Sequence, residues 1–164
     1  MTRLPIIVLS IIFVFSSCSN SYYIVRHAEK ATQEANMTSD VPLTAKGKQR
    51  AEALKEELKN KKIAYVFSTN TVRTKSTAQP TADYFHVPIE IYGPIPDSAF
   101  ISLIKSKKKN TLIVGHSNTI DDIVNMLCSR KEVSGDLPDS EYNNLFIVKK
   151  KGKRYIFSSR KYGE

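Results

Sequence analysis

Four short apolar runs, each rich in β-branched and aromatic residues, are spaced along the chain. They cover residues 22–25, 63–67, 87–91 and 111–114. Apart from Glu90, these runs do not alternate with polar residues, which is typical of strands that are buried on both faces of a parallel sheet. The pattern therefore predicts four strands of this kind.

Amphipathic helical patterns separate the runs. They cover residues 44–59, 98–108 and 119–128, and a further helix is expected to begin near Arg73. In the first pattern Leu54 and Leu58 share one stripe, and Thr44 stands where an N-cap is favoured. Strands that alternate with helices predict the α/β class, here a three-layer fold whose mostly parallel sheet carries helices on both faces.

The chain ends in a different pattern. Two short apolar runs, residues 145–148 and 155–158, flank the basic segment 149–154, which contains Gly152. Two such runs around a short polar segment with a glycine predict a C-terminal β-hairpin, in this case with a basic tip. The 164 residues suffice for one domain with its own core.

The first residues form an apolar run of their own. Residues 4–15 are interrupted only by Pro5 and Ser10, and Arg3 is the one charge before them. The run is shorter than the roughly 20 residues that a transmembrane helix needs, and its length suits the hydrophobic part of a secretory signal. The alternative is a buried strand or helix of the core.

Cys18 follows this run after Ser16 and Ser17, and the pattern resembles a bacterial lipoprotein signal. The resemblance implies a signal peptide over residues 1–17, a lipidated Cys18, a short tether over residues 18–21 and a folded domain over residues 22–164. It also implies that the protein is lipid-anchored in the bacterial cell envelope, on the periplasmic or outer-membrane face.

The positive charge is concentrated near the end of the chain. The formal net charge is +9, from 25 Lys and Arg against 16 Asp and Glu. Seven basic residues and one acidic residue fall in residues 149–164, whereas residues 18–148 hold 17 and 15. A nucleic-acid-binding protein usually has a broad basic face or a recognisable motif, so no nucleic-acid partner is expected. Beside a short membrane tether, the basic tail instead suggests contact with anionic lipid head groups.

Unusual polar residues stand just beyond three of the predicted strands. Arg26 and His27 follow the first strand, Arg73 follows the second in the first turn of a helix, and His116 follows the fourth. The carboxyl ends of parallel strands meet at one edge of the sheet, where α/β proteins bind ligands. Two guanidinium groups beside two imidazoles indicate a phosphoryl ligand.

These residues belong to a series of short motifs that spans residues 22–126. The motifs are Arg26 to Lys30 (Arg-His-Ala-Glu-Lys), Pro42 to Thr44 with Gly47 and Arg50, Arg73 with Thr77 and Ala78, and Gly115 to Ser117. The series resembles the histidine phosphatase superfamily, whose fold is phosphoglycerate mutase-like. Ser117 favours branch 1, because the second branch has Asp in that place.

The resemblance implies a phosphatase in which His27 is the nucleophile and becomes phosphohistidine, while Arg26, Arg73 and His116 hold the phosphoryl oxygens. A neutral imidazole is a nucleophile near pH 7, which supports that role. Fixed positive groups can stabilise the transferring phosphoryl group, and the chain lacks the clustered carboxylates of a two-metal phosphatase. We therefore expect neither a metal nor another cofactor.

The proton donor is the open part of this assignment. Asp97 is the candidate, and its alternative role is an ordinary N-cap of the helix that follows. Asp121 and Asp122 stand in the first turn of a predicted helix, where the helix dipole alone favours a carboxylate. His86 matches no motif and is interpreted as structural.

Two other functions compete with the phosphatase. A membrane-tethered module could keep the phosphate pocket without turnover, and a serine hydrolase could use Ser117 in the elbow-like segment Gly115 to Thr119. Serine hydrolases end that motif in Gly, whereas Thr119 stands here. Only 42 residues separate Arg73 from His116, so the pocket is expected to be shallow and open, suited to a phosphoprotein or to small phosphomonoesters.

Overall fold

The computed structural model describes residues 19–33 and 38–163. Cys18 and the apolar run before it lie outside the described residues, so the signal peptide, the lipid anchor and the envelope location stay predictions. Within the described part of the chain, no helix is long and apolar enough to cross a membrane.

Strands and helices alternate along the chain and then give way to a hairpin. The elements are β1 (Ser19–Arg26), α1 (Ala45–Leu58), β2 (Tyr65–Thr69), α2 (Val72–Phe85), β3 (Ile89–Tyr92), α3 (Ser98–Lys107), β4 (Thr111–Gly115), α4 (Ile120–Cys128), β5 (Asn144–Lys151) and β6 (Arg154–Lys161). They form one sheet in the order β3-β2-β4-β1-β5-β6, with β1 to β4 parallel and β5 and β6 antiparallel. The predicted α/β class, mostly parallel sheet and C-terminal hairpin are confirmed.

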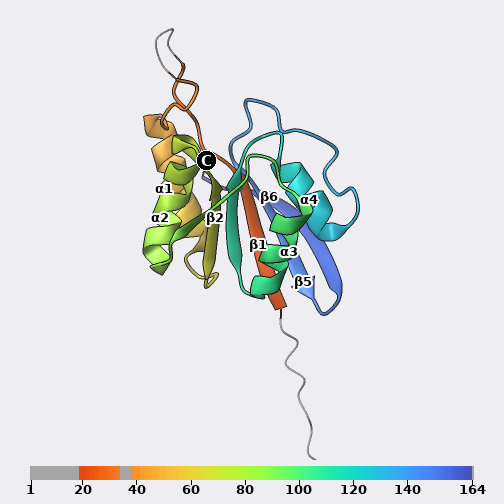
Figure 1. Cartoon of the computed structure of the whole chain (residues 1–164). Helices are drawn as coiled ribbons and strands as arrows, with labels where there is room; N and C mark the ends of the chain where they lie inside the picture. Colours follow the sequence, from red (N-terminus) through yellow and green to blue (C-terminus); the bar gives the residue numbers. More distant parts are fainter. Residues whose placement is uncertain (1–18, 34–37, 164) are drawn as a thin grey trace, which may run out of the picture.

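Helices cover both faces of the sheet, which gives three layers (Figure 1). On one face, Leu54 of α1 belongs to the same buried cluster as Val25 of β1. On the other face, Phe100 of α3 and Ile123 of α4 belong to the cluster that contains Ile24. Neighbouring residues of a strand point to opposite faces, so both sides of β1 are buried, and this is why the strand is a continuous apolar run.

β1 begins three residues earlier than its apolar run. Ser19 and Asn20 pair with Lys151 and Lys150 of β5, and the backbone N–H of Ser21 donates to Asn110 Oδ1 at 2.8 Å. The expectation of a tether over residues 18–21 is therefore wrong for residues 19–21. These polar residues are strand because β5 and the Asn110 side chain satisfy their backbone groups, a cause that apolarity does not reveal.

The hairpin is also longer than predicted. β5 and β6 are joined by the two residues 152–153, and Gly152 has a φ of +58°, a left-handed conformation that glycine adopts without steric cost. A turn this tight lets the ladder run to its last residue, so residues 149–151 lie in β5 and not in a loop.

Candidate active site

Two adjacent strands deliver the two histidines. β1 ends at Arg26 and is followed by His27, while its parallel neighbour β4 ends at Gly115 and is followed by His116. The backbone N–H of His27 donates to Gly115 O at 2.9 Å, which extends the pairing past the strand ends. The two imidazole centroids consequently lie 5.6 Å apart, with an angle of 69° between the ring planes. The structure thus brings these two side chains together.

His27 is held in one tautomer. Its Nδ1 lies 2.8 Å from Ala28 O, and because a carbonyl oxygen only accepts hydrogen bonds, Nδ1 carries the proton. Nε2 keeps its lone pair and has no hydrogen-bond partner among the described residues. Burial, followed by the charges of Arg26 and Arg73, lowers the pKa of His27 to about 3. A neutral imidazole with a free Nε2 therefore faces the site near pH 7.

His116 is oriented by a hydroxyl at the end of β2. Its Nε2 lies 2.9 Å from Thr69 Oγ1, and Thr69 Oγ1 donates its own proton to Thr74 Oγ1 at 3.1 Å. Nε2 of His116 is therefore the donor in its bond to Thr69. Burial first, then the charges of Arg73 and Arg26, lowers the pKa of His116 to about 4. Thr69 was not predicted as a site residue, although its place at the end of β2 was a usable signal.

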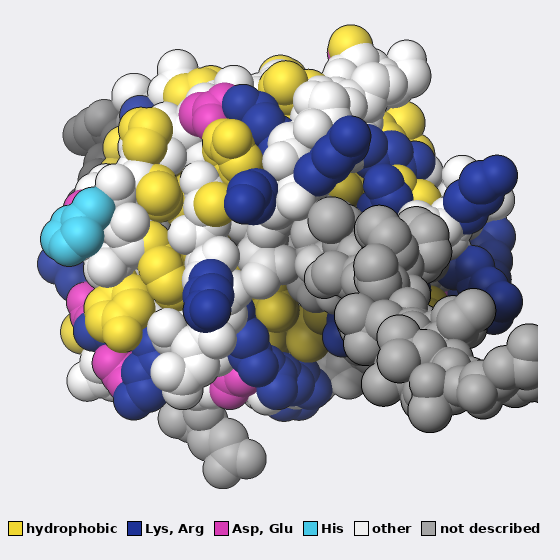
Figure 2. All heavy atoms as spheres, turned by 90° about the horizontal axis from the view of Figure 1, so that it is seen from below, with side chains coloured by type: hydrophobic (Ala, Val, Ile, Leu, Met, Phe, Trp, Pro, Cys, Tyr) yellow, Lys and Arg dark blue, Asp and Glu magenta, His cyan; other side chains and the backbone are white. Residues whose placement is uncertain are grey.

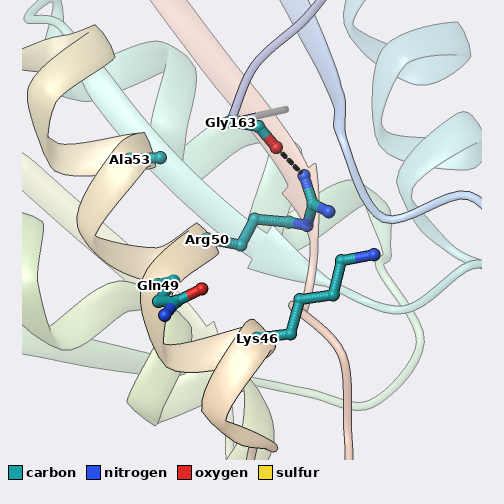
Figure 3. A pocket seen from close by; sticks show the side chains of 5 residues that line it. All are labelled: Lys46, Gln49, Arg50, Ala53 and Gly163. Atoms are coloured by element: carbon teal, nitrogen blue, oxygen red, sulfur yellow. Dashed lines mark hydrogen bonds between the residues drawn. The ribbon is translucent and has the colours of Figure 1, made fainter.

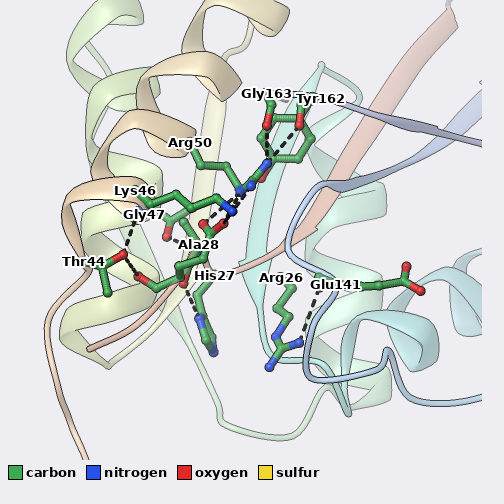
Figure 4. Close-up of polar contacts among 12 residues, drawn as sticks. Arg26, His27, Ala28, Thr44, Lys46, Gly47, Arg50, Glu141, Tyr162 and Gly163 are labelled. Carbon is green, nitrogen blue, oxygen red and sulfur yellow. Dashed lines mark hydrogen bonds and ion pairs between the residues drawn. The ribbon is translucent and has the colours of Figure 1, made fainter. Parts of the chain in front are cut away.

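A loop far along the chain fixes the guanidinium of Arg26. This group donates to Pro138 O at 2.9 Å, to Asp139 O at 3.3 Å and to Asp139 Oδ1 at 3.1 Å. Its Cζ atom lies 4.3 Å from the centroid of the Tyr142 ring. The loop thereby holds Arg26 next to His27, where both side chains point the same way (Figure 4). Neither Asp139 nor Tyr142 belongs to a motif, so neither residue could be predicted from the sequence.

Arg73 reaches the same site from the first turn of α2. Its Nη1 atom lies 3.3 Å from Ser39 O and 3.5 Å from Asp40 Oδ1. The Nε atoms of Arg73 and Arg26 are buried and have no hydrogen-bond partner among the described residues. A buried N–H without an acceptor costs about 1–3 kcal/mol. Both guanidiniums are therefore suited to a ligand that brings acceptor oxygens.

These side chains open onto one pocket of about 420 Å³. It is lined by Arg26, His27, Lys30, Arg73, Pro94, Ile95, His116, Ser117, Asn118, Thr119 and Asp139. Three of the described lining residues are cationic and one, Asp139, is a carboxylate, so the pocket favours an anion. Among the described residues, no group of three or more His, Cys, Asp and Glu side chains is arranged to hold a metal ion.

Asp97, the expected proton donor, does not line this pocket. It is the N-cap of α3, and its Oδ1 accepts a hydrogen bond from the backbone N–H of Phe100 at 2.8 Å. The structure thus shows the capping role of Asp97, and its role as proton donor stays a prediction. His86 ends α2 in a left-handed conformation and likewise lies outside the pocket lining.

A buried ion pair fixes the segment that follows His27. Arg50 of α1 donates to both carboxylate oxygens of Glu29, with its Nη2 atom 2.6 Å from Oε1, and to the backbone oxygens of Tyr162 and Gly163 (Figure 4). A second pocket, of about 330 Å³, lies beside this ion pair, and Lys46 and Arg50 are among the residues that line it (Figure 3). Glu29 pairs with both of these cations, so this pocket belongs to the support of the site.

Gly47 allows α1 to approach that segment. A Cβ atom at this position would lie 2.2 Å from the backbone oxygen of Glu29, which is well inside contact distance. The N–H of Gly47 also donates to Thr44 Oγ1 at 3.0 Å, so the predicted N-cap of α1 is confirmed. The helix can therefore start against the backbone next to His27 only with glycine here.

Comparisons with known proteins agree with this geometry. The model of the histidine phosphatase superfamily, branch 1, matches residues 22–93. A search of curated proteins found no significant match.

Solved structures match most of the chain. The protein histidine phosphatase SixA in complex with tungstate has a TM-score of 0.68 at 19% identity, covering 86% of this chain and 96% of that one. The phosphoglycerate mutase from Bacillus anthracis has a TM-score of 0.62 at 16% identity, covering 88% and 93%. A mycobacterial glucosyl-3-phosphoglycerate phosphatase has a TM-score of 0.64 at 9% identity, covering 87% and 98%. At these identities the likeness establishes a phosphoglycerate mutase-like fold.

Proposed function

We propose that this chain is a branch 1 histidine phosphatase that hydrolyses phosphorylated substrates through a phosphohistidine on His27. The family match over residues 22–93 and the phosphoglycerate mutase-like fold support this assignment. The single observation that carries it is the neutral His27, whose Nε2 has no hydrogen-bond partner among the described residues, beside two buried guanidinium N–H groups that lack acceptors in the same part of the chain.

The reaction runs in two displacements at phosphorus. Nε2 of His27 forms a bond to phosphorus, the bond to the leaving group breaks, and its electron pair departs with the leaving group. A water oxygen then attacks the phosphohistidine, and the P–Nε2 bond breaks with its electron pair returning to Nε2. Water gives its hydroxyl to phosphorus and its second hydrogen to a phosphate oxygen. The covalent intermediate divides hydrolysis into two easier steps.

The cationic groups act on the charge of the transferring phosphoryl group. Arg26 is fixed by the loop that contains Asp139, and Arg73 is fixed by Asp40, so neither guanidinium needs to reorganise when charge develops. Donors that are already oriented stabilise the transition state more than mobile ones. The Nδ1–H bond to Ala28 O keeps the His27 ring pointing at the phosphorus throughout.

The need to protonate the leaving group limits which phosphorylated substrates this site can hydrolyse. Asp139 is the one carboxylate among the described lining residues, and its side chain is almost fully exposed while it pairs with Arg26. An alkoxide leaving group needs a well-placed acid. The imidazole of a phosphorylated histidine does not, because it leaves as a neutral ring once its other nitrogen carries a proton. We therefore favour a phosphoprotein, with phosphohistidine as the first choice, over alkyl phosphomonoesters.

The variant Asp139→Asn tests whether this carboxylate donates a proton or only positions Arg26. If Asp139 donates a proton, the variant loses kcat on an alkyl phosphomonoester and keeps it on p-nitrophenyl phosphate, whose leaving group needs no acid. If Asp139 only positions Arg26, KM rises for both substrates and the ratio of the two kcat values is unchanged. Asp97→Asn is the matched control, since asparagine also caps a helix.

The function itself is tested in EDTA with a phosphohistidine peptide and p-nitrophenyl phosphate. The wild type should turn over both and should form an acid-labile phosphoenzyme that is absent in His27→Gln. Phosphate binding without turnover would instead identify a binding module. Esterase activity that disappears in Ser117→Ala would identify a serine hydrolase and overturn the proposal.

A further inference from the structure

The end of the molecule opposite the pocket carries a concentration of cationic side chains. β1 begins at this end, and the β5–β6 hairpin turns beside it, since Ser19 pairs with Lys151 and Asn20 with Lys150. Figure 2 views the molecule from this side, with many Lys and Arg side chains and few acidic ones on the visible surface. We call this surface the basic end, and it comprises Lys62, Lys108, Lys109, Lys150, Lys151, Lys153 and Arg154.

Two hollows and the strand pairing connect the cationic residues of the basic end. One hollow of about 400 Å³ is lined by Lys62, Lys108 and Lys109 together with Ser19 and Asn20. Another of about 420 Å³, beside the hairpin turn, is lined by Lys153 and Arg154. Each hollow could seat an anionic group against two or three cations.

The cations of the basic end are not neutralised by the protein itself. Within residues 19–33 and 38–163, none of them has a carboxylate oxygen within ion-pair distance, although nearby cations do. Lys107 lies 3.6 Å from Glu90, and Arg130 pairs with Glu132. Unpaired cations gathered on one surface create a positive potential that attracts an anionic partner.

Helix ends explain part of this charge but not the hairpin. Lys108 and Lys109 follow the C-terminus of α3, where the helix dipole favours cations. The cations at the β5–β6 turn lie in strands and a turn, where no such dipole acts. Lys62 and Lys108 also hold left-handed backbone conformations, with φ of 49° and 51°. Glycine or asparagine adopts that conformation more easily than lysine does, so the backbone gives no reason for lysine at these two positions.

The apolar run of the sequence leads directly to this surface. Three residues, 16–18, separate the end of the apolar run from Ser19 in the sequence, and three residues reach only about 10 Å when fully extended. Ser19 cannot move away from the surface, because pairing with β5 and the bond from Ser21 N–H to Asn110 Oδ1 fix the start of β1. In the sequence, a segment of twelve mostly apolar residues thus stands shortly before residues that lie at a surface of unpaired cations. An apolar segment beside cations matches a lipid bilayer with anionic head groups.

We propose that the basic end docks on an anionic lipid bilayer and that the pocket faces away from it. β1 runs from the basic end to Arg26, and its seven residue steps span about 23 Å at the usual rise of a strand. The pocket therefore stays clear of the bilayer and open to a phosphoprotein. The inference depends neither on lipidation of Cys18 nor on the phosphatase activity.

The test compares binding of the full chain to vesicles of phosphatidylcholine alone and to vesicles that also contain phosphatidylglycerol. The hairpin variant combines Lys151→Gln, Lys153→Gln and Arg154→Gln. Each basic residue near an anionic surface contributes about fivefold to binding, so three account for roughly a hundredfold. We expect a loss of that order on the anionic vesicles and no loss on the neutral ones.

Two further variants make the result specific. Lys62→Asn with Lys108→Asn removes two charges and suits the left-handed backbone, so it should weaken anionic binding about 25-fold without loss of stability. The matched control, Lys46→Gln with Lys48→Gln and Lys75→Gln, removes three charges near the N-termini of α1 and α2 and should change binding little.

Three outcomes would overturn the proposal. The hairpin variant could bind anionic vesicles as the wild type does. The control could lose as much binding as the hairpin variant, which would mean that net charge alone is responsible. Finally, the hairpin variant could lose affinity for a single-stranded oligonucleotide while its vesicle binding is unchanged, which would assign the basic end to a nucleic acid.

Discussion

The neutrality of His27 can be measured through the pH dependence of stability. Burial and neighbouring cations lower the pKa of His27 to about 3, from 6.5 in an unfolded chain. Between these two values the unfolded state binds a proton that the folded state refuses, so stability falls as the pH falls below 6.5. Integrating that difference gives a loss of about 2 kcal/mol between pH 7 and pH 5 from this one residue.

His27→Gln removes the titrating group and keeps a neutral side chain of similar reach. We expect the wild type to lose about 2 kcal/mol more free energy of unfolding than the variant between pH 7 and pH 5. Urea unfolding followed by far-UV circular dichroism measures this, and the chain has no tryptophan for a fluorescence assay. The contribution of His116 is present in both proteins and cancels to first order.

Equal losses in the two proteins would refute the reasoning. They would mean that His27 takes up its proton near pH 6.5 in the folded state, and the buried, cation-flanked environment would then not keep the imidazole neutral. The consequence for chemistry is large, because an imidazole of pKa 6.5 is only about 3% neutral at pH 5. With a pKa of about 3, nearly all of His27 stays nucleophilic at that pH.

Three other substitutions test the surroundings of the site. Thr69→Val keeps the shape of the side chain but removes the acceptor of the His116 Nε2–H, so kcat/KM on p-nitrophenyl phosphate should fall about tenfold. Gly47→Ala should lower the free energy of unfolding by about 2 kcal/mol or more, because its Cβ would meet Glu29 O. Gly135→Ala is the control: it has open space around it and should change the free energy of unfolding little in the same urea titration. Asp97→Ala should cost about 1 kcal/mol by loss of the N-cap and Asp97→Asn almost nothing; a large loss of kcat in the Asn variant would restore Asp97 as a proton donor.

Much of this arrangement follows from local sequence patterns. The apolar runs identify the central strands, and parallel strands necessarily bring their carboxyl ends to one edge. Residues placed directly after those ends, such as His27 and His116, must then lie close together. Two residues of α1 and its cap could also be predicted locally. Thr44 caps a backbone N–H only three residues away, and Gly47 contacts Glu29, which lies in a recognisable motif.

The contacts that could not be predicted from the sequence are those made by backbone groups or by residues far away in the chain. Arg26 is held by carbonyl oxygens more than a hundred positions away, and a carbonyl oxygen is the same whatever residue carries it. The first residues of β1 are polar, and they form part of the strand because they pair with the adjacent β5. Asp97 illustrates a different limit, since one carboxylate suits both a cap and an acid, and the sequence pattern alone does not distinguish the two roles.

The direction of the helices in this fold explains part of the positive charge at the basic end. In a parallel α/β sheet every helix between strands starts at the carboxyl edge and ends at the opposite edge, so its dipole favours an anion at the first and cations at the second. Lysines after α1 and α3 are thus expected on dipole grounds, with or without a membrane. The turn of the β5–β6 hairpin lies outside this rule, so the helix dipoles do not account for the charges of Lys151, Lys153 and Arg154. Their substitution, rather than that of the helix-end lysines alone, decides whether the basic end is a docking surface.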